Sequence, residues 1–252
     1  MAGGDKEEPT RHAAPARPPR TRYEATLDRV VEWSAATRSL FLRLGGGRLS
    51  FKPGQFISLE IPAGGAEPLV RPYSLASSPE AGDLLELCVD LVPGGQGSAY
   101  LFGLSSGAAV RFTGPFGSFV VDEPPAAETV FIGDGTGIAP IRPMVRRVIE
   151  RGGQHSVSIL HGVRDEREIL YRWEFEAWGR EHRRVHWEPI RAPGAVGENL
   201  YLQETVAERY VRADADRSRH FWVCGVGDIV RRLREMLRGA GYERRAVRYE
   251  QW

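Results

Sequence analysis

The first half of the chain is a series of short hydrophobic runs divided by Gly- and Pro-rich turns such as LGGG, KPGQ and PAGGAEP. The runs alternate apolar with polar residues or are rich in strand-forming residues, and they are SLFLRL (39–44), FISLEI (56–61), LLELCVDLV (84–92) and AVRFTG (109–114). One stretch of helical character, QGSAYLFGLS (96–105), interrupts them. Many short strands with a single helix predict an antiparallel β-barrel or sandwich.

The pattern of hydrophobic and polar positions changes after DEPPAAE (122–128), whose composition is typical of a hinge. Runs typical of buried strands now alternate with longer segments of helical periodicity. The expected strands are 129–133, 156–163, 184–190, 220–225 and 246–252, and the expected helices are 139–152, 169–181, 199–211 and 228–241. Strands that alternate with helices predict an α/β fold with a doubly wound parallel sheet.

These patterns divide the chain into three segments. Residues 1–22 are rich in Pro, Ala, Arg and Gly without apolar periodicity, which predicts a disordered tail, with a partner-binding arm as the alternative. We expect residues 23–124 to form the antiparallel β-barrel domain and residues 125–252 to form the α/β domain.

Composition and charge narrow the classes of function. With 34 Lys and Arg against 33 Asp and Glu, the net charge of +1 argues against bulk binding of nucleic acid or of an anionic membrane. Two cysteines, Cys88 and Cys224, make neither a disulfide framework nor a four-cysteine cluster. The sequence has no apolar run of about 18 residues and no signal-peptide pattern, so we expect a cytoplasmic protein.

A Gly-rich turn lies between an expected strand and an expected helix, in TVFIGDGTGIAPI. Gly133, Gly135 and Gly137 allow a sharp turn and a close approach of backbone N–H groups to a phosphate at the helix N-terminus. The spacing differs from the G-x-G-x-x-G dinucleotide fingerprint. The strand–turn–helix context favours a phosphate site over a purely structural turn.

Three other segments carry candidate chemistry. RPYSLASS (71–78) sets a cation, an aromatic ring and hydroxyls side by side, and on a strand Arg71 and Tyr73 face one way and Ser74 the other. PGGQGSAYL (93–101) offers a second Gly-rich helix start. Cys224 and Gly225 end a parallel strand, where ligands of such sheets bind. Taken singly, a polar strand end, an ordinary helix cap and a buried thiol explain these segments equally well or better.

Taken in order along residues 23–252, the motifs resemble the ferredoxin–NADP reductase superfamily. They are FKPGQFISL, RPYSLASSP, PGGQGSAYL, GPFGSF, GDGTGIAPI, HGVR, WVCGVGD and the terminal EQW. The resemblance implies a barrel that binds FAD and an α/β domain that binds NAD(P)H, with no metal.

The resemblance also implies roles for residues around the flavin. Arg71, Pro72, Tyr73 and Ser74 match the family's R-x-Y-S, in which the Arg pairs with the FAD diphosphate, the Tyr packs on the flavin and the Ser lies near flavin N5. Gly95, Gly97 and Ser98 match the helix start that faces the diphosphate. The terminal EQW implies that Trp252 stacks on the flavin or the adenine and that Glu250 acts as a polar or proton-relay group beside Ser74 and Cys224; the alternative is that Trp252 plugs a core edge.

A further set of residues is implied to bind the nicotinamide cofactor. Gly135, Thr136 and Gly137 match the G-T-G of its diphosphate turn, and Cys224 and Gly225 match the C-G beside the nicotinamide. Arg164 in HGVRDE and Arg191 in EPIRAP favour NADPH through its 2′-phosphate, while Asp165 and Glu166 leave NADH possible through its ribose hydroxyls. The sequence departs from the family at Ile190, where Ser or Thr is usual, and in CGVGDIV, which lacks the usual Pro and Met.

The function that we expect is that of an FAD-dependent ferredoxin/flavodoxin–NADP(+) reductase acting as a monomer. Its partner would be a separate acidic carrier, ferredoxin or flavodoxin. Arginines on expected helices of the second domain could dock it or could equally form a solvated face; they are Arg146, Arg147, Arg151, Arg231, Arg232 and Arg234. The alternatives are an NADH-dependent reductase component of an oxygenase, a non-catalytic subunit that holds flavin, and a reductase of a small acceptor.

Overall fold

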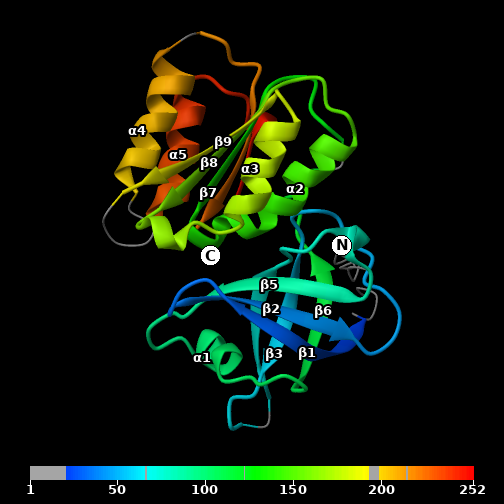
Figure 1. Cartoon of the computed structure of the whole chain (residues 1–252). Coiled ribbons are helices and arrows are strands. Elements are labelled where there is room, and N and C mark those ends of the chain that lie inside the picture. Colours follow the sequence, from blue (N-terminus) through cyan, green and yellow to red (C-terminus); the bar gives the residue numbers. More distant parts are fainter. Residues whose placement is uncertain (1–20, 66, 122, 193–198, 214) are drawn as a thin grey trace, which may run out of the picture.

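The computed structural model describes residues 21–65, 67–121, 123–192, 199–213 and 215–252. Residues 1–20 of the expected tail lie outside the described residues, whereas Arg22, which the sequence placed in that tail, is the first residue of a strand. Two units are visible, one built around an antiparallel sheet and one around a parallel sheet (Figure 1).

The first unit is a six-stranded antiparallel sheet with the order β4-β3-β6-β1-β2-β5. A bridge between Leu75, just after β4, and Leu87 of β5 joins the two edge strands and closes the sheet into a barrel. Inward side chains such as Leu40, Ile57 and Phe112 are fully buried in its core. The elements are β1 (Arg22–Glu32), β2 (Thr37–Leu44), β3 (Phe56–Ile61), β4 (Leu69–Ser74), η1 (Pro79–Ala81), β5 (Leu84–Asp90), α1 (Gln96–Phe102) and β6 (Ala109–Phe116).

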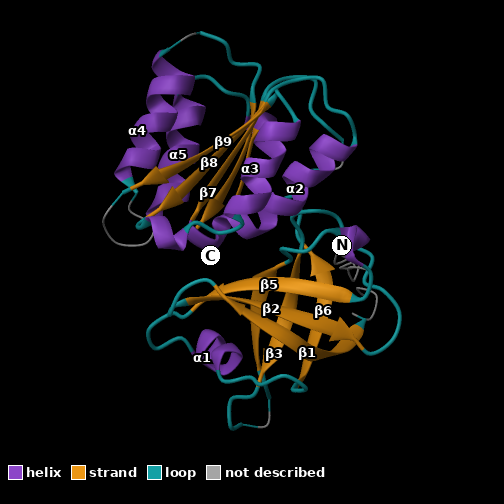
Figure 2. Ribbon diagram, viewed as in Figure 1, coloured by secondary structure: helices purple, strands orange, loops and turns teal. Residues whose placement is uncertain are grey.

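The second unit is a five-stranded parallel sheet with the order β11-β10-β7-β8-β9 and helices on both faces (Figure 2). Successive residues of β7 point to opposite faces, so Phe131 packs with the residues of α2 and α3, and Val130 with those of α4 and α5. The elements are β7 (Thr129–Asp134), η2 (Gly135–Gly137), α2 (Ile138–Glu150), β8 (Val157–Val163), η3 (Glu166–Glu168), α3 (Arg172–Glu181), β9 (Val185–Arg191), α4 (Leu200–Ala207), η4 (Glu208–Arg212), β10 (His220–Gly225), α5 (Asp228–Gly239), η5 (Arg244–Ala246) and β11 (Val247–Gln251).

The order of the parallel strands identifies where a ligand would bind. The chain runs from β7 outward through β8 to β9 and then returns to β10 on the other side of β7. Ligands of open α/β sheets bind outside the carboxyl ends of the strands at such a switch point. The turn after β7 and the end of β10 are therefore the expected edge of the site.

The domain interface contains a buried polar network, which we call the Glu86 cluster (Ser39, Glu86, Arg142 and Tyr171). Glu86 of β5 is 4% exposed and accepts hydrogen bonds from Ser39 Oγ (2.7 Å), Tyr171 OH (2.9 Å) and Arg142 Nη1 (2.5 Å). The Arg142 guanidinium also lies over the Tyr171 ring, 4.4 Å from its centroid. Since Ser39 and Glu86 belong to the barrel and the other two to the α/β unit, this cluster fixes one domain against the other.

The observed fold confirms the antiparallel barrel and the doubly wound sheet, with differences at the ends of elements. The helix expected at 169–181 begins at Arg172, because Tyr171 takes a left-handed conformation with φ of 55°. The helix expected at 199–211 is α-helical only to Ala207 and continues as the π-helical turn η4. The predicted boundary between residues 124 and 125 lies between β6 and β7 and stays a prediction.

Candidate active site at the domain interface

The two domains meet at a group formed by Ser74, Cys224 and Glu250. Ser74 ends β4 of the barrel, and its Oγ donates a hydrogen bond of 3.1 Å to Oε1 of Glu250 on β11. Glu250 is paired in register with Cys224 on the neighbouring strand β10. The three residues that the sequence suggested as catalytic are thus brought together from three strands of two domains.

Burial controls the protonation of this group. It raises the pKa of the Glu250 carboxyl to about 7, while the hydrogen bond from Ser74 acts in the opposite direction. Burial also raises the pKa of the Cys224 thiol well above its usual range, and the nearby Glu250 adds to this. Cys224 is 1% exposed and therefore stays a neutral thiol, whereas Glu250 can gain or lose a proton near neutral pH.

A second group lies on the barrel, where β4 packs against the start of α1. Arg71 and Tyr73 point to the same side as Gly97, since a Cβ on Gly97 would lie 2.6 Å from Tyr73 OH and 3.3 Å from Arg71 Cγ. The expected division of β4 into an Arg71–Tyr73 face and a Ser74 face is therefore observed. Arg71 is exposed and donates to the backbone oxygen of Val70, and the structure describes no ion pair for it. Its charge is available to an anion.

The turn before α1 holds its shape through Ser98. Ser98 Oγ accepts a hydrogen bond from Val92 N (3.0 Å) and donates one to the carbonyl oxygen of Gly95 (3.2 Å). Gly95 is the N-cap residue of α1 and has no side-chain cap. The Ser98 hydroxyl thus organises the turn, and the groups left to face a ligand are the backbone N–H groups of the Gly-rich segment.

The Gly-rich turn after β7 forms η2 and enters α2, which has no side-chain cap and no acid in its first turn. Gly137 is required by close packing, since a Cβ there would lie 2.2 Å from the carbonyl oxygen of Cys224. Gly135 has φ of +56°, and a Cβ on it would meet nothing within 4 Å. The outer side of the turn is therefore open, as the binding of a phosphate to helix N–H groups requires.

The buried His161 supports this turn from β8. Its Nε2 lies 3.2 Å from the carbonyl oxygen of Gly135, and because a carbonyl only accepts, Nε2 carries the proton. Burial lowers the pKa of His161 to about 4, so the ring is neutral. His161 was not among the candidate residues expected from the sequence, although its place in HGVR, at the end of a strand beside the turn, was a usable signal.

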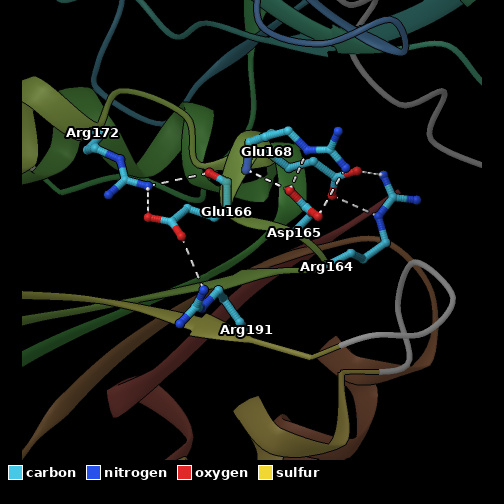
Figure 3. A network of polar contacts seen from close by, with 7 residues as sticks. Arg164, Asp165, Glu166, Glu168, Arg172 and Arg191 are labelled. Carbon is cyan, nitrogen blue, oxygen red and sulfur yellow. Dashed lines mark hydrogen bonds and ion pairs between the residues drawn. The ribbon is translucent and has the colours of Figure 1, made fainter.

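The arginines expected to recognise a 2′-phosphate lie in a network of exposed ion pairs (Figure 3). Arg164 donates to both oxygens of Glu168, at 2.9 and 2.8 Å, and Arg191 Nη1 lies 3.2 Å from Oε2 of Glu166. Arg172 approaches the other oxygen of Glu166 at 3.1 Å. Both arginines therefore have carboxylate partners that a phosphate would have to replace.

The acid that would otherwise hold a ribose diol is occupied as well. Asp165 accepts hydrogen bonds from the backbone N–H of Arg167 (2.9 Å) and from its Nε (2.8 Å), which caps η3. These bonds also lower the pKa of Asp165 to about 2. Glu166, shared between two arginines, is the more exposed alternative for a ribose.

The C-terminal Trp252 lies on the side of the α/β domain that faces the barrel (Figure 1). Its backbone N–H donates to the carbonyl oxygen of Gly225 at 3.3 Å, and the residue is 43% exposed. A side chain that plugs a core edge would be buried, so the exposure of Trp252 disfavours this alternative. Trp252 presents an aromatic surface next to the end of β10.

Among the described residues, no group of three or more His, Cys, Asp and Glu side chains is placed to hold a metal ion. The helices in that part of the chain are all too short or too polar to cross a membrane.

Family models match both domains. The oxidoreductase FAD-binding domain matches residues 24–121, and the oxidoreductase NAD-binding domain matches residues 131–235. These matches correspond to the barrel and to the α/β unit.

Similar proteins include reductases of more than one system. The chain is 36% identical over 238 residues to ferredoxin–NADP reductase B of Sorangium cellulosum, covering 91% of this chain and 97% of that protein. It is 35% identical over 171 residues to the reductase subunit of an aromatic O-demethylase of Amycolatopsis, covering 66% of this chain but 50% of that protein. The chain thus spans nearly all of the first relative and half the length of the second.

Solved structures share the whole fold. A cytochrome P450 reductase of Amycolatopsis superposes with a TM-score of 0.79 at 28% identity, covering 96% of this chain and 73% of that one. A ferredoxin NADP+ reductase of Neisseria gonorrhoeae with bound FAD and NADP gives a TM-score of 0.73 at 20% identity over 92% of this chain and 98% of that one, which shows likeness of fold.

Proposed function

We propose, from the premise that this chain belongs to the ferredoxin–NADP reductase superfamily, that it is a ferredoxin- or flavodoxin–NADP(+) reductase. The chain is an NAD(P)H-dependent flavoprotein oxidoreductase with FAD as its flavin. The carrier protein, the preference for NADPH and the roles of individual residues are the proposed part. The observation that carries the proposed residue roles is the meeting of Ser74, Cys224 and Glu250 where the two domains join.

The barrel residues fit FAD. The exposed Arg71 would pair with the diphosphate, and the Tyr73 ring beside it would pack on the flavin. Gly95, whose N–H donates to the carbonyl oxygen of Val92, and Ser98 shape the turn, and the backbone N–H of Gly97 would face the same diphosphate. Pro72 lies between Arg71 and Tyr73 and holds this part of β4 extended, and Trp252 would cover an exposed ring of the cofactor.

The α/β residues fit a nicotinamide dinucleotide. The open turn of Gly135, Thr136 and Gly137 would bind its diphosphate, and the end of β10 at Cys224 and Gly225 would lie beside the nicotinamide. Gly137 touches the backbone of Cys224, so the two parts of the site are built as one unit.

When bound, FAD supplies the conversion between hydride and single-electron transfer. Ser74 and Glu250 would hold a proton at the Glu250 carboxyl, whose pKa of about 7 allows it to exchange near neutral pH. The neutral, buried thiol of Cys224 would line the nicotinamide side and exclude water without adding charge. The two domains hold both binding surfaces in one orientation through the Glu86 cluster.

A preference for NADPH is supported by Arg164 and Arg191. Their side chains are 41% and 61% exposed, and exposed ion pairs contribute only about 0–1 kcal/mol each. A 2′-phosphate, which accepts charge-assisted hydrogen bonds from Arg, can therefore replace the carboxylates at little cost.

A separate carrier protein as electron acceptor is supported by the relative of nearly equal length, which its name describes as a ferredoxin–NADP reductase. The helix arginines suggested for docking of the carrier give less support to this interaction than the sequence implied. Five of the six pair with carboxylates of the same chain, in Arg146–Glu150, Arg147–Glu80, Arg151–Glu123, Arg231–Asp228 and Arg234–Glu235. This favours a solvated face for them.

The second candidate is an NADH-dependent reductase component of an oxygenase. It is supported by the similarity to the reductase subunit of the aromatic O-demethylase of Amycolatopsis. A non-catalytic flavin-holding subunit is disfavoured because Ser74, Cys224 and Glu250 are intact and assembled. The ratio of kcat/KM for NADPH to that for NADH, measured with a dye acceptor, separates the first two. We expect a preference for NADPH and reduction of cytochrome c only when a ferredoxin or flavodoxin is added. A preference for NADH above about tenfold, roughly 1.4 kcal/mol, would refute the reductase proposed first.

A further inference from the structure

Asp90 links the barrel to the Gly-rich turn of the α/β domain. It ends β5, and its Oδ1 accepts a hydrogen bond of 2.6 Å from Thr37 Oγ1 within the barrel. Its Oδ2 accepts one of 2.9 Å from Thr136 Oγ1, in the middle of the turn that joins β7 to α2. Both threonines are 6% exposed. A carboxylate of one domain is therefore bonded to the turn to which we assign the dinucleotide diphosphate in the other.

Neighbouring side chains neutralise the negative charge of Asp90 only poorly. Arg164, beyond β8, attracts the carboxylate, but this guanidinium already donates to both oxygens of Glu168. Glu168 on η3 adds a like charge, and Cys88, two residues earlier on β5, is buried and neutral. Burial raises the pKa of Asp90, against the opposing effects of the bonds from Thr37 and Thr136 and of Arg164.

We propose that Asp90 couples binding of the nicotinamide dinucleotide to the uptake of one proton, an inference that rests on the placement of the diphosphate at Gly135–Gly137. The diphosphate brings two negative charges to a turn that already touches an ionised carboxylate. At a partly buried boundary such like charges repel more strongly than in water. Protonation of Asp90 removes the repulsion, with the proton coming from solvent.

Protonation also changes what Thr136 can do. While Asp90 is ionised it only accepts, so the Thr136 hydroxyl must give its hydrogen to Oδ2. A protonated Asp90 can instead donate to Thr136 Oγ1, which releases the hydroxyl hydrogen toward a phosphate oxygen. The carboxyl thus changes both the charge and the hydrogen-bond direction at the turn.

The thermodynamic linkage between ligand binding and proton binding gives the direction in which pH changes the ligand affinity. Because the bound diphosphate favours protonated Asp90, ligand affinity rises as pH falls through the pKa of this carboxyl, and ligand binding takes up a proton in that range. Asp90 therefore differs from an arginine at a phosphate site, which stays charged at all these pH values.

The test is calorimetric titration of the FAD-loaded full chain with ADP-ribose, at a series of pH values from acidic to weakly alkaline and in buffers of different ionisation enthalpy. ADP-ribose carries the diphosphate without the nicotinamide ring, so it does not reach Glu250. For the wild type we expect proton uptake and an affinity about tenfold lower at the high end of the range, equivalent to about 1.4 kcal/mol. In Asp90→Asn we expect the uptake to disappear and the affinity at high pH to rise by about the same factor.

The matched control is Asp83→Asn, since Asp83 is an exposed carboxylate of the same domain, paired with Arg43, and its removal should leave both the uptake and the affinity unchanged. Absence of proton uptake by the wild type, or its persistence in Asp90→Asn, would overturn the proposal. Should Asp90→Asn not fold, the wild-type proton count decides alone.

A parallel titration with ADP-ribose 2′-phosphate separates this inference from the proposed function. Equal affinities for the two ligands would refute the preference for NADPH. The number of protons taken up with ADP-ribose would still test the role of Asp90. If neither ligand binds, the placement of the diphosphate fails and the role of Asp90 with it.

Discussion

The hydroxyl of Ser74 lies 3.1 Å from a carboxylate oxygen of Glu250, although 176 residues separate the two in the chain. One belongs to the last residue of a barrel strand and the other to the last strand of the α/β domain. This hydrogen bond is possible only when both domains are folded and docked. It makes Glu250 the titrating group for which the structure gives the clearest expectation.

Turnover should fall as pH rises through the pKa of Glu250. Burial raises this pKa from 4.5 to about 7, so Glu250 holds its proton below that value and loses it above. In the reduction of NADP(+) by the reduced carrier, which consumes one proton for each NADPH formed, kcat should decline above about pH 7, and Glu250→Gln should make the profile flat over this range. Steady-state rates across the range check it; an unchanged inflection in the variant would assign the titration elsewhere.

Replacing Arg191 should affect NADPH alone. Arg191→Ala removes a donor for a 2′-phosphate, and we expect KM for NADPH to rise about tenfold with KM for NADH unchanged. Arg172→Ala is the control, because Arg172 shares the partner Glu166 but lies on α3. Equal rises for both cofactors, or an equal effect in the control, would contradict the assignment.

Removing Arg142 should strongly destabilise the protein. Arg142→Met leaves the carboxylate of Glu86, whose side chain is 5% exposed, without its charged partner. Such a loss costs about 3–5 kcal/mol. Adding Glu86→Gln should restore part of the stability, since the uncompensated charge disappears with it. Urea unfolding measures both, with Arg43→Met as an exposed control expected to change the free energy of unfolding little.

A methyl group on Gly137 should separate flavin binding from reduction. Its Cβ would overlap the Cys224 carbonyl, which forces the end of β10 away from the turn at about 1–3 kcal/mol. We expect Gly137→Ala to keep FAD but to be reduced slowly by NADPH in stopped-flow experiments. Gly46→Ala, where a Cβ meets nothing within 4 Å, serves as the control, and wild-type rates in Gly137→Ala would argue against this site.

Deleting Trp252 should alter the flavin environment. A ring that covers the cofactor changes its absorption spectrum or the NADPH to NADH preference when it is removed. Trp173→Ala, which removes a 78% exposed indole on α3, should change neither. If truncation after Gln251 leaves both properties as in the wild type, Trp252 does not stack on the flavin.

The sequence was sufficient to predict those strands and helices whose hydrophobic pattern is visible within the element itself. The buried run of β7 and the strongly amphipathic α5 were found because burial and periodicity coincide there. Strand β1 was missed because only two of its residues, Ala25 and Leu27, are buried. Strand β4 was expected only as a polar strand end from Arg71 onward, because Val70, Arg71 and Pro72 are exposed and the strand contains a Pro.

Contacts between distant segments were beyond local patterns. The convergence of Ser74, Cys224 and Glu250 was expected only through the family resemblance, because no spacing rule joins residues of different domains. Asp90 and Glu86 have the pattern of ordinary polar positions of one strand, and only docking of the second domain adds the partners Thr136 and Arg142. Arg164 and Arg191 were expected as ligands of a 2′-phosphate, but their ion pairs with Glu168 and Glu166 were not expected.

The strand that carries Glu250 makes the site sensitive to changes of chain length. β11 is the edge strand of its sheet and pairs within that sheet with β10 alone, in the register that sets Glu250 opposite Cys224. Loss or gain of one residue in the short segment between Gly241 and Val247 would shift that register by one and turn Glu250 to the opposite face. Substitutions at the exposed Arg244 and Arg245 of this segment should be tolerated, while single-residue insertions and deletions should abolish activity.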